Sequence, residues 1–432
     1  MTNTYITNAT WALTGEKIDL RMGHGDEPIT IHRDGIALPG ISKVTPAGEM
    51  QVPAGARQIN AEGKILLPAL FDLHATINID GHSKRESIYR AGQAANRGGV
   101  WGMLVMPSRG FVFDNAATLD SFDDAVSQRS LATMVPAGCI TEGMKGEQQA
   151  PYNTLAARGV TILSDSGNMP ASLLMLHRAM KYAAEMELTF AIRGDVPCLS
   201  HNTYMHPSST SYLLGLHGTP ACAEEIGIET IIRLAKDAGV RLHVQTVSTA
   251  EGVEIIRRAK AAGMKGLTAE VALHHLLYTH ENVGDYDTTF KTVPPLRESS
   301  DCAALLAGVK DGTIDCIVTD HTPCLPFAKK QDFVSAPQGM VGLDTFLPAI
   351  YTHLVKPGKL SWAEVVRACC TAPVDIVNPY DREEDVPVAA PLLLFSPDEQ
   401  QLITADSLSC GTTNNPMLGS TLSGTVTLPI NR

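Results

Sequence analysis

The feature that most constrains the fold is a repeated alternation of short apolar runs and amphipathic stretches between about residues 67 and 375. The apolar runs include Trp101–Met106, Val160–Leu163, Leu188–Ile192, Val240–Val247, Gly266–Val271 and Ile314–Val318. Amphipathic stretches such as Ala221–Ala238 and Glu251–Ala262 lie between several of them. Strands that alternate with helices over about 300 residues form a parallel sheet, and at this length a closed barrel of eight βα units is the expected form.

The two ends of the chain have a different character. Both contain short β-like runs separated by turn signals, for example Asp34-Gly35 and Pro39-Gly40. We expect the two ends to pair with each other in one small composite β-sandwich domain. The predicted organisation is therefore α/β, with a TIM-like (β/α)8 barrel over residues 67–379 and a composite domain built from residues 1–66 and 380–432.

The composition excludes several classes of protein. The net charge of −12 at pH 7 argues against a nucleic-acid-binding protein, because phosphate contacts need a basic surface. No stretch reaches the roughly 18 uncharged apolar residues of a membrane-spanning helix, and no signal peptide is visible at the N-terminus. The nine cysteines are scattered without a CxxC pair, which is typical of reduced thiols. We therefore expect a cytoplasmic protein without a membrane partner.

Polar side chains follow several of the predicted strands. His74 follows the first apolar run of the barrel, and Asp165, Arg193, Thr246 and Asp320 come shortly after later runs. Catalytic groups of such barrels lie at the carboxyl ends of the strands. We therefore expect these side chains to share one mouth, where a metal-dependent hydrolase would place its ligands.

Five segments resemble the bacterial, aspartate-bridged dihydroorotases of the cyclic amidohydrolase superfamily. They are residues 66–78 (LLPALFDLHATIN), 243–263, 268–324, 336–348 and 414–426. The resemblance covers nearly the whole chain, and it implies an amidohydrolase barrel whose binuclear zinc site activates the hydrolytic water. It also implies the reversible closure of carbamoyl-aspartate to dihydroorotate, a step of pyrimidine biosynthesis.

The metal site implied by this resemblance is incomplete. Three positions at which the family has ligand histidines are occupied by Thr76, Arg193 and Thr246. Zinc binds imidazole, thiolate and carboxylate, and it binds a threonine hydroxyl or a guanidinium poorly. The remnant metal ligands are His74, Asp165 and Asp320, with Asp320 at the position of the general base.

The substrate-binding positions are changed as well. The family's carboxylate-binding arginine aligns with Asn78, and two of its asparagines align with Ser108 and Val293. Three loop histidines are potential substitute metal ligands: His82, His201 and His206. We expect His275 and His321 to be structural.

Two hypotheses follow. In the first, Arg193 stands in for the metal by pairing with Asp165 or Asp320, and no cofactor is bound. The protein is then a catalytically inactive dihydroorotase homologue, a dimer or larger oligomer that acts as a structural or regulatory partner of aspartate transcarbamoylase. In the alternative, the protein is an active cyclic amidohydrolase, acting on dihydroorotate or on another cyclic amide, with one zinc ion held by His74, Asp165 and Asp320.

Overall fold

Parallel strands form the centre of the larger part of the molecule. The computed structural model describes residues 3–23, 30–77, 86–170, 172–378 and 388–428. A three-stranded sheet has the order β10-β9-β8, and a five-stranded sheet has the order β11-β12-β13-β14-β15. These strands are β8 (Leu70–Ala75), β9 (Val100–Val105), β10 (Thr133–Pro136), β11 (Ile162–Leu163), β12 (Thr189–Arg193), β13 (Arg241–Gln245), β14 (Leu267–Ala272) and β15 (Cys316–Val318).

The two parallel sheets meet at both of their seams. An isolated parallel bridge joins Gly138 to Leu163 at one seam, and a second bridge joins Ala75 to His321 at the other. At the second seam the amide of Thr76 donates a hydrogen bond of 2.7 Å to the carbonyl of His321. The strands are thus joined around a ring, and the α/β barrel architecture predicted from the sequence is confirmed.

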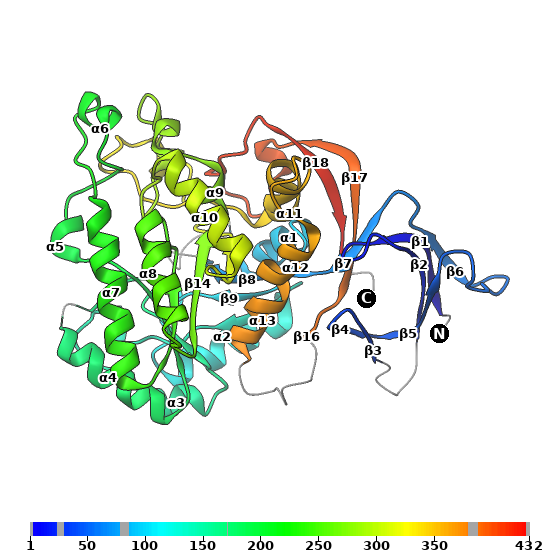
Figure 1. The fold of residues 1–432 in the computed structure, drawn as a ribbon, viewed down its shortest axis with the longest axis horizontal. Coiled ribbons are helices and arrows are strands. Elements are labelled where there is room, and N and C mark those ends of the chain that lie inside the picture. Colours follow the sequence, from blue (N-terminus) through cyan, green and yellow to red (C-terminus); the bar gives the residue numbers. More distant parts are fainter. Residues whose placement is uncertain (1–2, 24–29, 78–85, 171, 379–387, 429–432) are drawn as a thin grey trace.

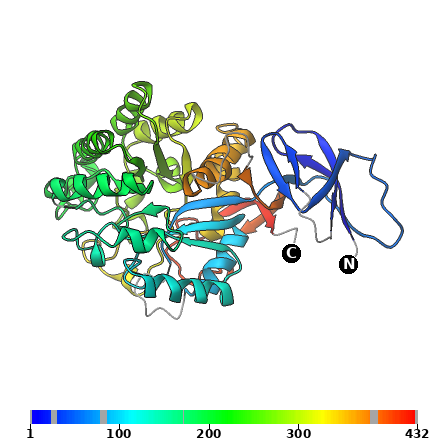
Figure 2. The ribbon, with the colours of Figure 1, turned by 90° about the horizontal axis from the view of Figure 1, so that it is seen from below.

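Helices surround these strands (Figures 1 and 2). The longer ones are α1 (Ile88–Arg97), α2 (Ala116–Arg129), α4 (Leu173–Glu185), α7 (Ala221–Ala238), α8 (Ala250–Ala261) and α10 (Ser299–Asp311). Short helices lie in the loops and after the last strand: α3 (Tyr152–Ala156), α5 (Pro197–Ser200), α6 (Ser209–Leu213), α9 (Leu273–Leu277), α11 (Phe346–Ile350), α12 (Trp362–Val366) and α13 (Ala372–Val377). Helix α7 buries Ile228, Ile231 and Ala235 on one face, because residues three and four apart share a side of a helix. It ends at Gly239, whose φ of +72° gives the left-handed cap.

The strands separate apolar from polar side chains. On β13, Leu242 and Val244 belong to the main hydrophobic core together with helix residues. The alternate residues His243 and Gln245 bond instead to polar partners within the ring of strands. Successive side chains of a strand point to opposite faces, so this alternation brings polar groups into the barrel and toward its mouth.

The two ends of the chain pair in a separate, seven-stranded sheet, seen at the right of Figure 1. Its order is β18-β17-β7-β1-β2-β5, with β6 paired to β1. The strands are β1 (Thr4–Trp11), β2 (Lys17–Met22), β5 (Ile41–Pro46), β6 (Arg57–Asn60), β7 (Ile65–Pro68), β17 (Leu392–Leu402) and β18 (Thr421–Thr427). A smaller sheet joins β3 (Thr30–Arg33) and β4 (Ile36–Pro39) to β16 (Val388–Ala389). Leu392 of β17 pairs with Pro68 of β7, so the C-terminal segment is fixed beside the entry to β8. The residue limits of the two domains stay a prediction.

Two further observations concern the cysteines and the helices. All nine cysteines lie in the described ranges and are free. No helix in the described ranges is long and apolar enough to cross a membrane.

Candidate functional site

A cavity of about 590 Å³ opens at the mouth of the barrel. Most of the residues singled out in the sequence line it: His74, Thr76, Ser108, Arg193, Thr246, Val293 and Asp320. They come from β8, from the end of β12 and from the loops that follow β9, β13, α9 and β15. The exceptions are Asp165, which does not line the cavity, and Asn78, which lies outside the described residues.

His74 is the first link of a buried polar chain. Its Nδ1 lies 2.5 Å from Oε1 of Glu270, and Oε2 of Glu270 lies 3.0 Å from Nε2 of His243. Burial disfavours a charged imidazole, but the Glu270 carboxylate outweighs this effect and, with Asp320, raises the pKa of His74 to about 9. The Glu270 carboxylate therefore favours the protonated form of His74, whereas an imidazole that binds a metal must be neutral.

Asp320 lies between two imidazoles. Its carboxylate oxygens are 3.7 Å from Nε2 of His74 and 3.8 Å from Nε2 of His274. Burial raises the pKa of Asp320 to about 6, although the charge of His74 partly opposes this shift. Its backbone φ is +47°, a conformation that few residues other than glycine adopt. Asp320 is thus held at the mouth as a carboxylate that could exchange a proton near neutral pH.

The sequence analysis did not single out His274, and it predicted a structural role for the adjacent His275. His275, predicted to be structural, lies 3.2 Å through its Nε2 from the carbonyl of Pro294 and does not line the mouth cavity. His274 is the second residue after β14, so the rule that located the other strand-end residues could have located it as well.

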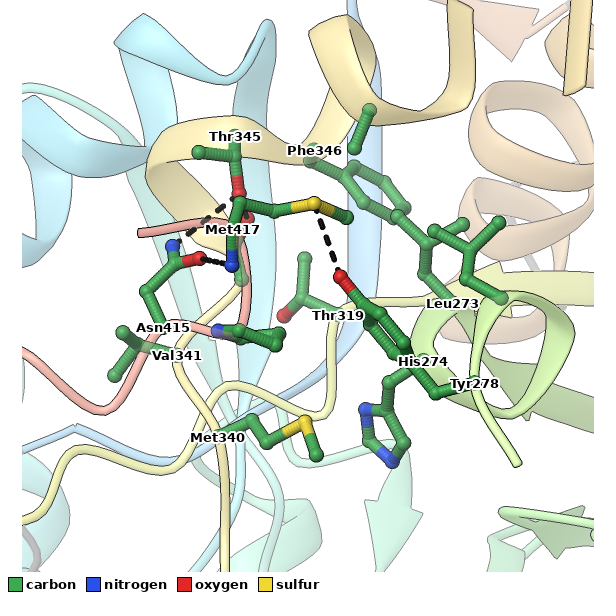
Figure 3. Close-up of a pocket in the computed structure, with 14 residues that line it drawn as sticks. Leu273, His274, Tyr278, Thr319, Met340, Val341, Thr345, Phe346, Asn415 and Met417 are labelled. Carbon is green, nitrogen blue, oxygen red and sulfur yellow. Dashed lines mark hydrogen bonds between the residues drawn. The ribbon is translucent and has the colours of Figure 1, made fainter. Parts of the chain in front are cut away.

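An apolar cavity lies behind His274 (Figure 3). This second hollow, of about 30 Å³, is lined by Leu273, Phe346 and Met417 among others. Tyr278 donates a hydrogen bond of 3.1 Å to the Met417 sulfur there. Burial in these surroundings holds the pKa of His274 well below its usual range, and its Nε2 has no hydrogen-bond partner in the described part of the chain. His274 is therefore a neutral imidazole beside Asp320.

Asp165 has a different role from the one expected of a metal ligand. Its Oδ1 accepts hydrogen bonds from the amides of Ile140 (2.8 Å) and Thr141 (3.1 Å), and its Oδ2 accepts one of 2.5 Å from the Thr141 hydroxyl. The buried carboxylate thus holds the loop after β10. The structure does not bring Asp165 together with His74 and Asp320, because its oxygens are directed to this loop.

Arg193 reaches the mouth without a carboxylate partner. Its Nη1 donates to the carbonyl of Val293 at 3.3 Å. The expected salt bridge to Asp165 or Asp320 is not formed, and no other carboxylate within the described ranges forms one with Arg193. Burial lowers the pKa of Arg193, yet a guanidinium keeps its proton in a protein. A positive charge therefore remains at the mouth.

Other polar pairs hold the strand ends in place. Asp72 accepts hydrogen bonds from the amide and hydroxyl of Thr319, which joins β8 to the segment after β15. His321, predicted to be structural, lies 2.7 Å from Glu86. The potential substitute ligands His201 and His206 do not line the mouth cavity, and His82 lies outside the described residues.

A binuclear zinc site does not fit the residues at this mouth. Thr76, Arg193 and Thr246 line this mouth and supply no imidazole, thiolate or carboxylate, and Arg193 adds a cation to the same cavity. Within the described ranges, no group of three or more His, Cys, Asp or Glu side chains could hold a metal ion. The arrangement is suited to hydrogen bonding.

Comparisons with known proteins agree on one family. The family model described as "Dihydro-orotase-like" matches residues 63–252. The "Dihydroorotase" of Pelotomaculum thermopropionicum is 36% identical over 382 residues, which are 88% of this chain and 89% of that protein. The "Dihydroorotase" of Leifsonia xyli is 35% identical over 405 residues, 93% of this chain and 92% of that protein.

Solved structures show the same fold at lower identity. The L-hydantoinase (dihydropyrimidinase) of Arthrobacter aurescens superposes with a TM-score of 0.80 at 20% identity, covering 100% of this chain and 94% of that one. The dihydropyrimidinase of Brevibacillus agri gives a TM-score of 0.77 at 18% identity, covering 98% and 92%. Since full-length relatives exceed a third in identity, the chain belongs to the dihydroorotase family.

Proposed function

We propose that this protein is a member of the dihydroorotase family that does not catalyse the dihydroorotase reaction. We propose further that it forms a dimer or larger oligomer and acts as a structural or regulatory partner of aspartate transcarbamoylase. The observation that carries the proposal is the mouth itself. Arg193 and His74, whose pKa is raised, both line the mouth cavity. A metal-dependent hydrolase needs neutral and anionic ligands at this place.

The chemistry of amide hydrolysis supports this reading. Hydrolysis of a cyclic amide needs an activated water, and metal ions activate water by lowering its pKa to about 7. Without such a metal, Asp320 is a carboxylate with two imidazoles near it. Losing one preorganised electrostatic contact typically costs about a hundred- to thousandfold in rate. The same loss at several positions leaves little catalysis to detect.

The test is a direct assay of the purified protein in both directions, with carbamoyl-aspartate and with dihydroorotate, after growth with added zinc. The dihydroorotase of Pelotomaculum thermopropionicum, prepared in parallel, is the positive control. We expect no turnover above background for this chain. Turnover within about a hundredfold of the control would contradict the proposal.

The partner role needs its own experiment. The aspartate transcarbamoylase from the same organism is mixed with this chain and analysed by size-exclusion chromatography with light scattering. We expect one complex containing both chains and a homo-oligomer when this chain is run alone. Separate elution of the two proteins at micromolar concentration would contradict the partnership without restoring an enzymatic role.

A second candidate function rests on the Asp320 group. His74 and Asp320 line the mouth cavity, His274 lies 3.8 Å from Asp320, and the relatives described above share the name "Dihydroorotase". These facts favour an active cyclic amidohydrolase with one metal ion and a changed cyclic-amide substrate. A screen of cyclic amides with zinc-supplied protein tests it, and Asp320→Asn should then abolish any activity found.

A further inference from the structure

A groove lies on the outside of the barrel, where the neighbouring helices α7 and α8 end (Figure 1). It consists of two adjoining hollows of about 290 and 520 Å³, which share Lys236 and Met264. The larger hollow is also lined by Arg241, the first residue of β13, and by Gly266, which directly precedes β14. Strands start at the end of the barrel opposite to the mouth, so this groove is remote from the mouth cavity.

The charge of this groove is opposite to that of the whole chain. The chain has a net charge of −12, yet among the described residues five cations line the two hollows against one carboxylate, that of Glu229. The cations are Arg233, Lys236, Arg241, Arg258 and Lys265. Arg233 and Lys236 are three residues apart on α7, so they lie on the same side of that helix. Positive charge is thus concentrated in one groove of an acidic protein.

The cations of the groove are available to a partner to different degrees. Arg233 and Arg258 form exposed ion pairs within their own helices, and Arg241 donates a hydrogen bond to the carbonyl of Glu187. No carboxylate in the described ranges pairs with the two lysines of the groove, which are both exposed. Because exposed ion pairs are weak, carboxylates of a partner can contact the lysines directly and compete for the two paired arginines.

The floor of the groove is apolar. Ile232 and Ile255 are each 6% exposed and Val240 is 4% exposed, and the half-buried Met264 lies where the two hollows meet. In the described part of the chain, no aromatic side chain lines either hollow. Proteins that bind single-stranded nucleic acids stack the bases on aromatic side chains. A floor of aliphatic side chains below a rim of cations therefore favours an acidic peptide over a nucleic acid.

We infer that this groove binds an acidic segment of a partner protein, with the carboxylates of the segment at the basic rim and its aliphatic side chains on the apolar floor. Opposite charges across an interface accelerate association and select the partner. A two-fold dimer through this face would bring the groove against its own copy, where like charges repel each other. The inference goes beyond the proposed function, because a groove remote from the mouth does not depend on catalysis or on metal binding there.

The experiment is fluorescence anisotropy with the full-length protein at pH 7.5, in 50 mM and in 300 mM NaCl. The probe is a fluorescein-labelled twelve-residue peptide that repeats Glu-Leu-Asp-Gly. A peptide that repeats Gln-Leu-Asn-Gly is the uncharged control, and a labelled uridine dodecamer is the nucleic-acid control.

The charge of the groove is reversed by Lys236→Glu together with Lys265→Glu. Lys17→Glu together with Lys43→Glu is the matched control, because these two lysines are exposed on the separate seven-stranded sheet and the change in net charge is the same. If the groove variant does not fold, Lys236→Gln together with Lys265→Gln decides.

We expect saturable binding of the acidic peptide in 50 mM NaCl, weakened about tenfold or more by the groove variant and unchanged by the control variant. Binding should also weaken in 300 mM NaCl, because salt screens charges at an exposed surface, and the uncharged peptide should bind at least about tenfold more weakly. Absence of saturable binding, equal binding to the groove variant, or tighter binding of the uridine dodecamer would each overturn the inference. Light scattering is measured on the same samples, and an oligomer that the groove variant dissociates would overturn it as well, since a second copy would then occupy the groove.

Discussion

The buried pair of His74 and Glu270 gives the most specific prediction. Glu270→Gln removes the charge of the carboxylate while keeping the shape of the side chain. Glu270, with smaller contributions from Asp320 and Asp72, outweighs the effect of burial and raises the pKa of His74 from 6.5 to about 9. At about 1.4 kcal/mol for each pKa unit, this corresponds to stabilisation on the order of 3 kcal/mol.

The pH dependence of this stabilisation has a definite sign. Because the pKa of His74 is raised in the folded state, the contribution is complete below about pH 6.5 and is lost as the pH rises through about 9. With about 2.1 cal/mol/K of unfolding entropy per residue, the loss of about 3 kcal/mol lowers the melting temperature by roughly 3 °C. We expect this decrease at pH 6 and a much smaller one at pH 9.5.

Differential scanning calorimetry at the two pH values measures the effect. Glu254→Gln serves as the control, because Glu254 forms an exposed pair with Arg257 and such pairs contribute little. If His74 were instead a metal ligand oriented by Glu270, metal affinity would rise with pH as the imidazole deprotonates. A decrease in melting temperature by Glu270→Gln that becomes larger between pH 6 and pH 9.5, and that a chelator removes, would refute the reasoning.

Further predictions concern the other side chains of the site. Asp165→Ala leaves three buried donors without an acceptor, so we expect chemical denaturation to show a loss of about 2–5 kcal/mol in unfolding free energy, with unchanged metal content. A loss of bound metal would contradict the role of Asp165 in holding the loop. Because burial raises the pKa of Asp320 to about 6, its ionised form destabilises the fold above that pH. Asp320→Asn should therefore raise the melting temperature at pH 8 but not at pH 3.5, and a decrease at pH 8 would count against this account. Restoring histidine together at Thr76, Arg193 and Thr246 should create zinc binding that elemental analysis detects. Unchanged zinc content would show that these are not the lost ligand positions.

The sequence predicted the fold and most of the mouth for a simple physical reason. Parallel strands present their carboxyl ends on one side of a barrel. A polar residue near the carboxyl end of such a strand can therefore reach the mouth, as His74, Arg193 and Asp320 do.

Where the sequence prediction failed, the direction of a single side chain decided the outcome. Asp165 follows the two-residue strand β11, and its carboxylate is directed to the amides of the neighbouring loop. His274 and His275 are adjacent, and the start of α9 directs them to different partners. Glu270 lies inside the apolar run of β14. An acidic residue within a buried strand indicates a partner that is also buried. This signal was present in the sequence and could have identified Glu270.

The most direct test of the central claim is the zinc content of the untagged protein, purified without chelators from cells grown with added zinc. A mouth occupied by Arg193 and a protonated His74 predicts well below one zinc ion per chain. Two zinc ions per chain would contradict the account, because they would require neutral His74 and a ligand set that the described residues do not supply.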